Sequence, residues 1–171
     1  GGVTHIYSTP LAPRFLAAPA PGGALVAAWS DAYRIAFLNG GGDTLRVVER
    51  PGESFAIPDT MRQRVDSAYA KFRATPGLGT CTPHALPDYS VLPPLNHLMF
   101  DEAGRLWVEV LDGAGRRWDV FSREGELTGS ARSNPRLDAV RPIIRSGRLA
   151  VVEEAPEGHH LVVVYRLIES G

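Results

Sequence analysis

Short apolar runs alternate with Gly- and Asp-containing turns over most of this chain. In residues 104–127, two strand-like runs flank a Gly-rich turn, and a second turn closes the segment. Two strands alone cannot bury a core. The sequence must therefore provide other strands against which this hairpin packs.

The same pattern occurs three times. Gly-Arg-Leu-Trp-Val at 104–108 recurs as Gly-Arg-Leu-Ala-Val at 147–151, and more loosely as Gly-Ala-Leu-Val-Ala at 23–27. A candidate strand precedes each copy (14–18, 97–100 and 140–144), and an aromatic-containing strand follows each copy (33–37, 118–121 and 161–167). Pro142 indicates an interrupted or edge strand in the third copy. Each unit predicts a series of short antiparallel strands, four where the pattern is complete.

A four-stranded unit that recurs every 40–50 residues is typical of a β-propeller blade. One blade exposes apolar residues on both faces, so it must pack between neighbours. Its inner strands then become continuously apolar, as in LVVVYRLI at 161–168. The sequence therefore predicts an all-β fold in one domain, 1–171, with about three blades: 14–50, 95–132 and 137–168.

One helix and a Pro-rich segment form an insertion at 51–94. The helix is predicted at 58–74, with Asp59 or Thr60 as the capping residue. Its apolar stripe consists of Met61, Val65, Tyr69 and Phe72. Two interpretations are open: the helix covers and shields one end of the propeller, or it acts as a lid or partner-binding element.

Two linked motifs occupy the second unit, D-x-x-G-x-L-W-V at 101–108 and W-x-V-F-S-x-x-G-x-L at 118–127, and V-Y-R follows at 164–166. They resemble the closing blades of bacterial six-bladed β-propeller proteins related to the NHL and TolB-like groups, in which Asp stands at the place of Ser122. The matching residues, with the Gly that opens the third copy, are Asp101, Gly104, Leu106, Trp107, Val108, Trp118, Val120, Phe121, Gly125, Leu127, Gly147, Val164, Tyr165 and Arg166. The resemblance covers 95–168 well and 14–50 loosely. It implies a fold, and a secreted or periplasmic location, but no activity.

A six-bladed propeller needs roughly 260 residues, more than the 171 of this chain. Three interpretations are open: a C-terminal part of a longer propeller, two chains that complete one ring, or a compact three-bladed fold. The first is favoured because GGVTHIYS at 1–8 begins in the middle of the pattern. The expected partners therefore include the missing blades of the same chain or a second copy.

Amino-acid composition and net charge exclude some classes of binding partner. With 44% hydrophobic and 22% charged residues, the chain has the balance of an ordinary globular domain. The formal net charge of −1 creates no overall field that would attract nucleic acid. No apolar run approaches 18 residues, so no membrane insertion is predicted. We expect neither nucleic acid nor a membrane as a partner.

Residue types with catalytic potential are scattered. Cys81 is the only cysteine, which excludes an internal disulfide and a Cys-based zinc site; it precedes His84 in a Pro-rich loop that offers no helix N-terminus to activate a thiol. The Gly-rich segment 38–45 lies between two strands and predicts a hairpin turn. His159 and His160 are adjacent, so on a strand they point to opposite faces and do not share a metal.

The sequence therefore predicts a non-enzymatic binding or scaffold propeller that recognises a protein, peptide or glycan on one face, with no cofactor. Trp107, Trp118 and Phe121 are expected in the core between blades. The alternative is a metal-assisted hydrolase of the gluconolactonase type, in which Asn96 and Asp101 would be two of the calcium ligands.

Overall fold

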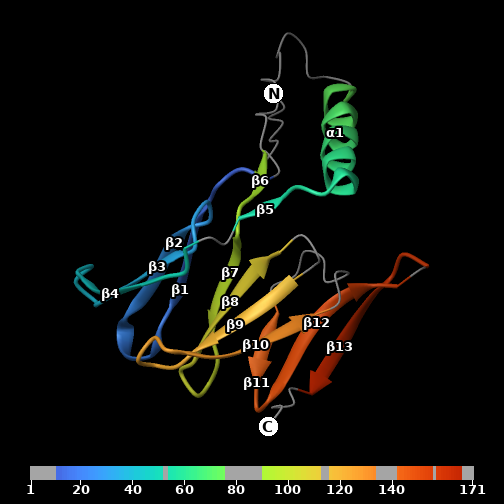
Figure 1. Cartoon of the computed structure of the whole chain (residues 1–171). Helices are drawn as coiled ribbons and strands as arrows, with labels where there is room; N and C mark the ends of the chain where they lie inside the picture. Colours follow the sequence, from blue (N-terminus) through green and yellow to red (C-terminus); the bar gives the residue numbers. More distant parts are fainter. Residues whose placement is uncertain are drawn as a thin grey trace, which may run out of the picture.

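The structure, a computed structural model, describes residues 11–51, 54–75, 90–112, 116–133, 142–155 and 157–166. Antiparallel sheets make up most of it, and the predicted all-β fold is confirmed (Figure 1). The first sheet consists of β1 (Phe15–Pro19), β2 (Leu25–Trp29), β3 (Arg34–Leu38) and β4 (Thr44–Glu49), in that order, with a short 3-10 turn, η1 (Pro21–Gly23), between β1 and β2. The second sheet consists of β7 (Leu95–Phe100), β8 (Leu106–Leu111), β9 (Arg116–Phe121) and β10 (Leu127–Ser133).

The third sheet contains three strands in the described part of the chain: β11 (Ile143–Arg145), β12 (Arg148–Glu154) and β13 (His160–Arg166). β11 begins directly after Pro142 and is an edge strand, as the proline predicted. Two-residue strands, β5 (Phe55–Ala56) and β6 (Val91–Leu92), pair at the base of the insertion, which carries α1 (Asp59–Arg73). That helix is too short and too polar to cross a membrane, and so the described residues include no membrane-spanning helix.

The three sheets stack in chain order, with a separate core on each side of the second sheet. The first core lies between the first and second sheets and includes Ile35, Phe37 and Val108. The second core joins the second sheet to the third and includes Trp107 and Leu149. The edge strands β1 and β7 contact each other. The second sheet is thus the middle layer of the stack.

The hairpin turns share one local structure. In the turns at 39–43, 101–105, 122–126 and 155–159, the first N–H donates to the fifth carbonyl, and the fourth N–H donates to the first carbonyl. The fourth residue is Gly in each turn, with φ between 75° and 91°, in the left-handed region that Gly adopts without strain. Ser122 serves where the resembled family has Asp, because its Oγ accepts the N–H groups of Glu124 and Glu126.

Helix α1 rises away from the three sheets beside β5 and β6 (Figure 1), which argues against the expected shielding role. The predicted stripe of Met61, Val65, Tyr69 and Phe72 is its least exposed side, although no α1 residue is buried. The predicted capping residue was wrong. Pro58 occupies the N-cap position and makes no side-chain capping bond, because Asp59 is already the first helical residue.

Replacement of Trp107 tests the second core. Trp107 is 5% exposed, whereas Trp29 on the outer face of the first sheet is 59% exposed. Trp107→Ala should lower the free energy of unfolding by about 3–5 kcal/mol, because it removes apolar contacts and leaves a cavity. Trp29→Ala should cost far less. Urea denaturation of both variants measures the difference, and similar losses would contradict the placement of Trp107 in a core.

Candidate functional site

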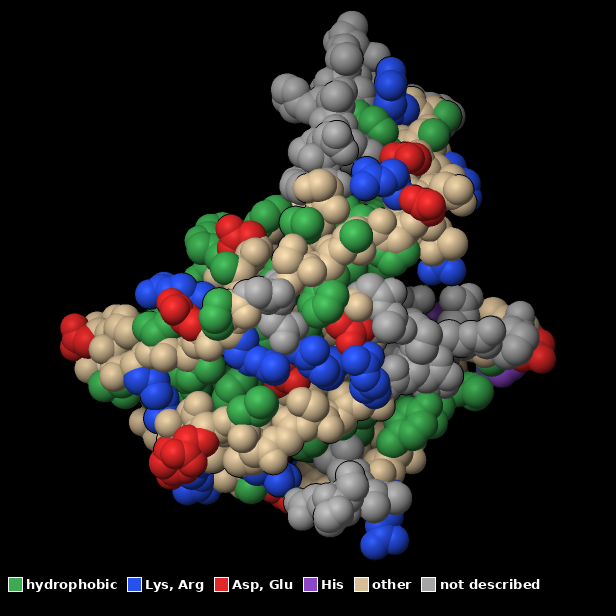
Figure 2. Space-filling view, in the orientation of Figure 1, with side chains coloured by type: hydrophobic (Ala, Val, Ile, Leu, Met, Phe, Trp, Pro, Cys, Tyr) green, Lys and Arg blue, Asp and Glu red, His purple; other side chains and the backbone are tan. Residues whose placement is uncertain are grey.

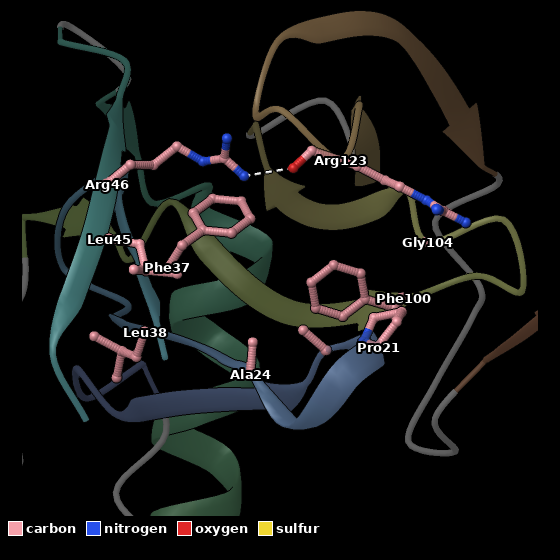
Figure 3. Close-up of a pocket in the computed structure, with 10 residues that line it drawn as sticks. Pro21, Ala24, Phe37, Leu38, Leu45, Arg46, Phe100, Gly104 and Arg123 are labelled. Atoms are coloured by element: carbon pink, nitrogen blue, oxygen red, sulfur yellow. Dashed lines mark hydrogen bonds between the residues drawn. The ribbon is translucent and has the colours of Figure 1, made fainter. Parts of the chain in front are cut away.

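A cleft of about 370 Å³ opens between the first and second sheets (Figure 3). It lies at the end of the stack formed by the turns at 20–24, 39–43, 101–105 and 122–126, which we call the turn rim. Pro21 and Ala24 of the β1–β2 turn line one side. The cleft is therefore built from segments of two sheets that are far apart in sequence.

Aromatic and aliphatic side chains form the wall of the cleft. Phe37 and Leu38 come from β3, and Phe100 comes from the end of β7. Phe37 points inward because alternate residues of β3 face the first core. An irregularity in the β3–β4 pairing separates Leu38 from Phe37, and Leu45 of β4 lies at the edge of the cleft with 65% of its surface exposed.

Arg46 of β4 reaches from the first sheet across to the second. Its guanidinium carbon lies 4.2 Å from the centroid of the Phe37 ring. Nη2 donates to the Arg123 carbonyl oxygen at 2.5 Å (Figure 3). Nη1 donates to the Glu124 carbonyl oxygen. Its Nε packs under Gly125, where an added Cβ would approach within 2.8 Å. Arg46 thus holds the 122–126 turn of the second sheet against the first sheet, a contact that we call the Arg46 latch.

Arg123 makes the next link along the turn rim. Its Nε donates to the Ala103 carbonyl oxygen at 2.8 Å. It lies across Gly104, where an added Cβ would stand 2.7 Å from this Nε. Glycine is therefore required at positions 104 and 125 for two reasons. Each residue has a positive φ, and an arginine side chain lies so close to each that a Cβ would not fit.

The two arginines of the cleft, Arg46 and Arg123, differ from the other arginines of the sheets in the kind of group that binds them. Arginines with a carboxylate partner are Arg34, Arg50, Arg105, Arg116, Arg117, Arg132 and Arg145. Arg46 and Arg123 are held by neutral carbonyl groups instead, within the described residues. Glu124, an exposed residue of the same turn, has a lowered pKa. Hydrogen bonds from the backbone N–H of Glu124 and from Ser122 lower this pKa most, and the positive charges of Arg46 and Arg123 lower it further. The mouth of the cleft therefore carries positive charge.

A buried polar network closes the opposite end of the same two sheets. Asp119 of β9 accepts hydrogen bonds from Tyr33 Oη at 2.9 Å, Arg50 Nη1 at 2.7 Å, Arg117 Nε at 2.9 Å and Ser130 Oγ at 2.7 Å. Burial opposes ionisation, but the bonds from Arg117, Ser130 and Tyr33 and the charge of Arg117 hold the pKa of Asp119 below its usual value. Burial and the nearby Asp119 raise the pKa of Tyr33. This network is satisfied internally and leaves the cleft as the open end.

The proposed pair of calcium ligands is not brought together. Asn96 and Asp101 lie at opposite ends of β7, about 16 Å apart at 3.3 Å per strand residue. Asp101 accepts bonds from Arg105 Nε at 2.7 Å and Trp107 Nε1 at 2.9 Å, and Asn96 Nδ2 donates to Glu109 at 2.7 Å. No cluster of three His, Cys, Asp or Glu side chains suited to a metal occurs in the described part of the chain. The alternative interpretation, in which Asn96 and Asp101 share a calcium ion, is therefore contradicted at this pair of residues.

The remaining motif residues have structural positions. Trp107, Trp118 and Phe121 are buried, as expected, and so are Leu106, Val108 and Val120. Gly147 lies in the β11–β12 turn with φ 65°, and Tyr165 lies on the partly exposed β13. The segment 38–45 contains the β3–β4 hairpin turn, as predicted, and His159 and His160 follow the Gly158 turn. Cys81 and His84 are outside the described residues.

Sequence reasoning did not identify Arg46 or Arg123. Arg123 precedes the turn glycine by two residues, which gives only a weak signal. Arg46 lies within a strand with no local motif, and its partners are 77 and 78 residues away in the sequence.

Comparison with known proteins gives no family. No protein-family model matches the chain, and no curated protein matches it. One similar solved structure is the crystal structure, at 1.35 Å resolution, of a protein of unknown function from Bacteroides caccae, with 12% identity and a TM-score of 0.38. The match covers 89% of this chain but only 45% of that chain. This likeness is too low to show a shared fold, and the resemblance to six-bladed propellers stays a prediction.

Replacement of Gly125 tests the Arg46 latch. Gly125→Ala places a Cβ against Arg46, whereas Gly42→Ala, at a similar positive φ, meets no atom within 4 Å. Both should lose roughly 1–2 kcal/mol through left-handed strain. Gly125→Ala should lose about 1 kcal/mol more, because Arg46 must leave its two carbonyl partners. Equal losses in urea denaturation would contradict the latch.

Replacement of Asp119 tests the buried network. Asp119→Asn leaves the charges of Arg50 and Arg117 without their buried partner, so it should cost about 3–5 kcal/mol at pH 7. Because the folded pKa of Asp119 is lowered, its contribution is present above the unfolded value of about 3.9 and is lost as pH falls through the folded pKa. Wild-type protein should therefore lose stability below about pH 5 more steeply than Asp119→Asn. Parallel profiles of thermal stability against pH would argue against this network.

Proposed function

We propose that this chain is a non-enzymatic binding module of the β-propeller type, which recognises a protein, peptide or glycan at its turn rim. The observation that carries this proposal is the cleft between the first two sheets, with its apolar wall and two fixed arginines. Its volume of about 370 Å³ falls in the usual range of ligand pockets, about 300–1,000 Å³. A residue-sized group fits this space.

The composition of the cleft favours binding over catalysis. Its described lining residues offer apolar contact and guanidinium donors, which hold and orient a ligand. General acid–base or nucleophilic catalysis relies on His, Asp, Glu, Cys or Ser side chains, and the lining side chains are of other types. The metal-dependent alternative has lost its proposed pair of ligands.

The stack of sheets supports the propeller part of the proposal. The edge strands β1 and β7 contact each other, while β4 and β10 are the opposite edges of the same sheets. Exposed apolar side chains cover the outer face of the first sheet, with Phe15 and Trp29, and that of the third sheet, with Ile143 and Val162. Figure 2 shows hydrophobic side chains exposed over β13. Further blades, from a longer chain or a second copy, would cover these faces.

A bulky side chain placed in the cleft tests the proposed binding function. Ala24→Phe places a ring in the cleft, and Ala150→Phe is the matched control on the third sheet. A random peptide display library and a glycan array should yield ligands that bind the wild type and Ala150→Phe, but that bind Ala24→Phe at least about tenfold more weakly, which corresponds to 1.4 kcal/mol.

Two outcomes would overturn this function. Ligands that bind Ala24→Phe as well as the wild type would place recognition elsewhere. Hydrolysis of lactone substrates that requires Ca²⁺ and stops with EDTA would show an enzyme instead.

A further inference from the structure

We infer that the cleft at the turn rim takes an apolar group that carries a carboxylate. The C-terminal residue of a peptide presents this chemistry, and so does a free acid with a single ring. The inference rests on the proposed binding function and names the ligand class of the same cleft.

The bonds that Arg46 and Arg123 make within the protein use only part of their hydrogen-bonding capacity. A guanidinium has five N–H donors. Carbonyl oxygens take two from Arg46 and one from Arg123, and a carbonyl carries no net charge that would neutralise the cation. Arg46 and Arg123 therefore keep both positive charge and unused donors next to the cleft, in contrast with the arginines that pair with carboxylates.

Contacts within the protein hold both arginine side chains in place before a ligand binds. The Phe37 ring and two carbonyls of the 122–126 turn fix the Arg46 guanidinium, and the Ala103 carbonyl fixes Arg123. A ligand that meets fixed donors does not bear the entropy of ordering long side chains. Hydrogen bonds from a guanidinium to a carboxylate are among the strongest in proteins, because both groups are charged.

The apolar wall of the cleft lies next to these arginines. Figure 3 shows the rings of Phe37 and Phe100 facing the same space, with the Arg46 guanidinium beside Phe37. An apolar group between these rings would have its carboxylate within reach of the arginines. The volume of about 370 Å³ lies near the lower limit of ligand pockets, about 300 Å³, and it suits one ring rather than a large cofactor.

The nearest acid does not fill this role. Glu124 follows Arg123 in the turn, and its side chain is fully exposed. Water and salt screen its charge.

Calorimetric titration tests the ligand class with three probes. These are 3-phenylpropionate, the peptide acetyl-Ala-Ala-Ala-Phe with a free carboxylate, and the same peptide with a C-terminal amide. Wild-type protein should bind at least one of the two acids. If it binds the peptide acid, the peptide amide should bind at least about tenfold more weakly, since the amide cannot form charge-assisted hydrogen bonds with the arginines. Binding of the peptide acid alone identifies a peptide terminus, and binding of 3-phenylpropionate alone identifies a free acid.

Matched variants locate the contact. Leu45→Glu adds a negative charge at the mouth of the cleft and should bind the acid at least about fivefold more weakly than Leu45→Gln, because the two variants lose the same apolar side chain and differ only in charge. Arg123→Gln should weaken binding, and Arg148→Gln on the third sheet should not. Leu45 is exposed, so its variants should fold even where the loss of Arg123 disturbs the turn.

The results of these experiments distinguish a failure of the carboxylate specificity from a failure of the proposed binding function. Measurable binding of the peptide amide with the affinity of the peptide acid, equal binding of the acid by Leu45→Glu and Leu45→Gln, or no binding of either acid would overturn the carboxylate specificity. If library ligands without a carboxylate still require an open cleft at Ala24, the binding function stands and only the ligand class fails. If no ligand depends on the cleft, the binding function fails as well.

Discussion

Strand β8 has five consecutive buried side chains, from Leu106 to Val110, and this burial determines the rest of the arrangement. Alternate residues of a strand point to opposite faces, so β8 needs an apolar partner on each side. Leu106, Val108 and Val110 meet the first sheet, and Trp107 meets the third. A single sheet with two apolar faces is not stable in water, and the stack of three sheets follows from that constraint.

Buried charge is accommodated in this middle sheet only where it is paired. Glu109 follows the same alternation and is 2% exposed, but Arg116 and Asn96 bind its two oxygens. Asp119 is completely buried and binds groups from both sheets. An unpaired carboxylate at either place would be strongly destabilising. The bonds from Tyr33 and Arg50 to Asp119 fix how the first two sheets meet, while the apolar cores supply the attraction.

Much of the fold follows from sequence because its signals are local. Alternating apolar residues and turn glycines such as Gly104 mark the hairpins, since strand period and positive φ are properties of a few neighbouring residues. The cleft has no such signal, because Arg46 acquires its role only when a turn 77 residues away packs beside it. The Asn96–Asp101 hypothesis failed for the converse reason: residues close in sequence are far apart along an extended strand.

At the turn rim, the same side chains that hold the turns in place are the ones that we propose bind the ligand. Arg46 and Arg123 hold the turns of the second sheet in place, and the absence of a Cβ at Gly125 and Gly104 lets them lie close to the backbone. A ligand that binds these arginines binds only the folded rim, so it must also stabilise the contact between the two sheets. Removal of an arginine alters both properties together. A change of charge at the exposed Leu45 alters recognition while the latches stay intact, and so it separates the two roles.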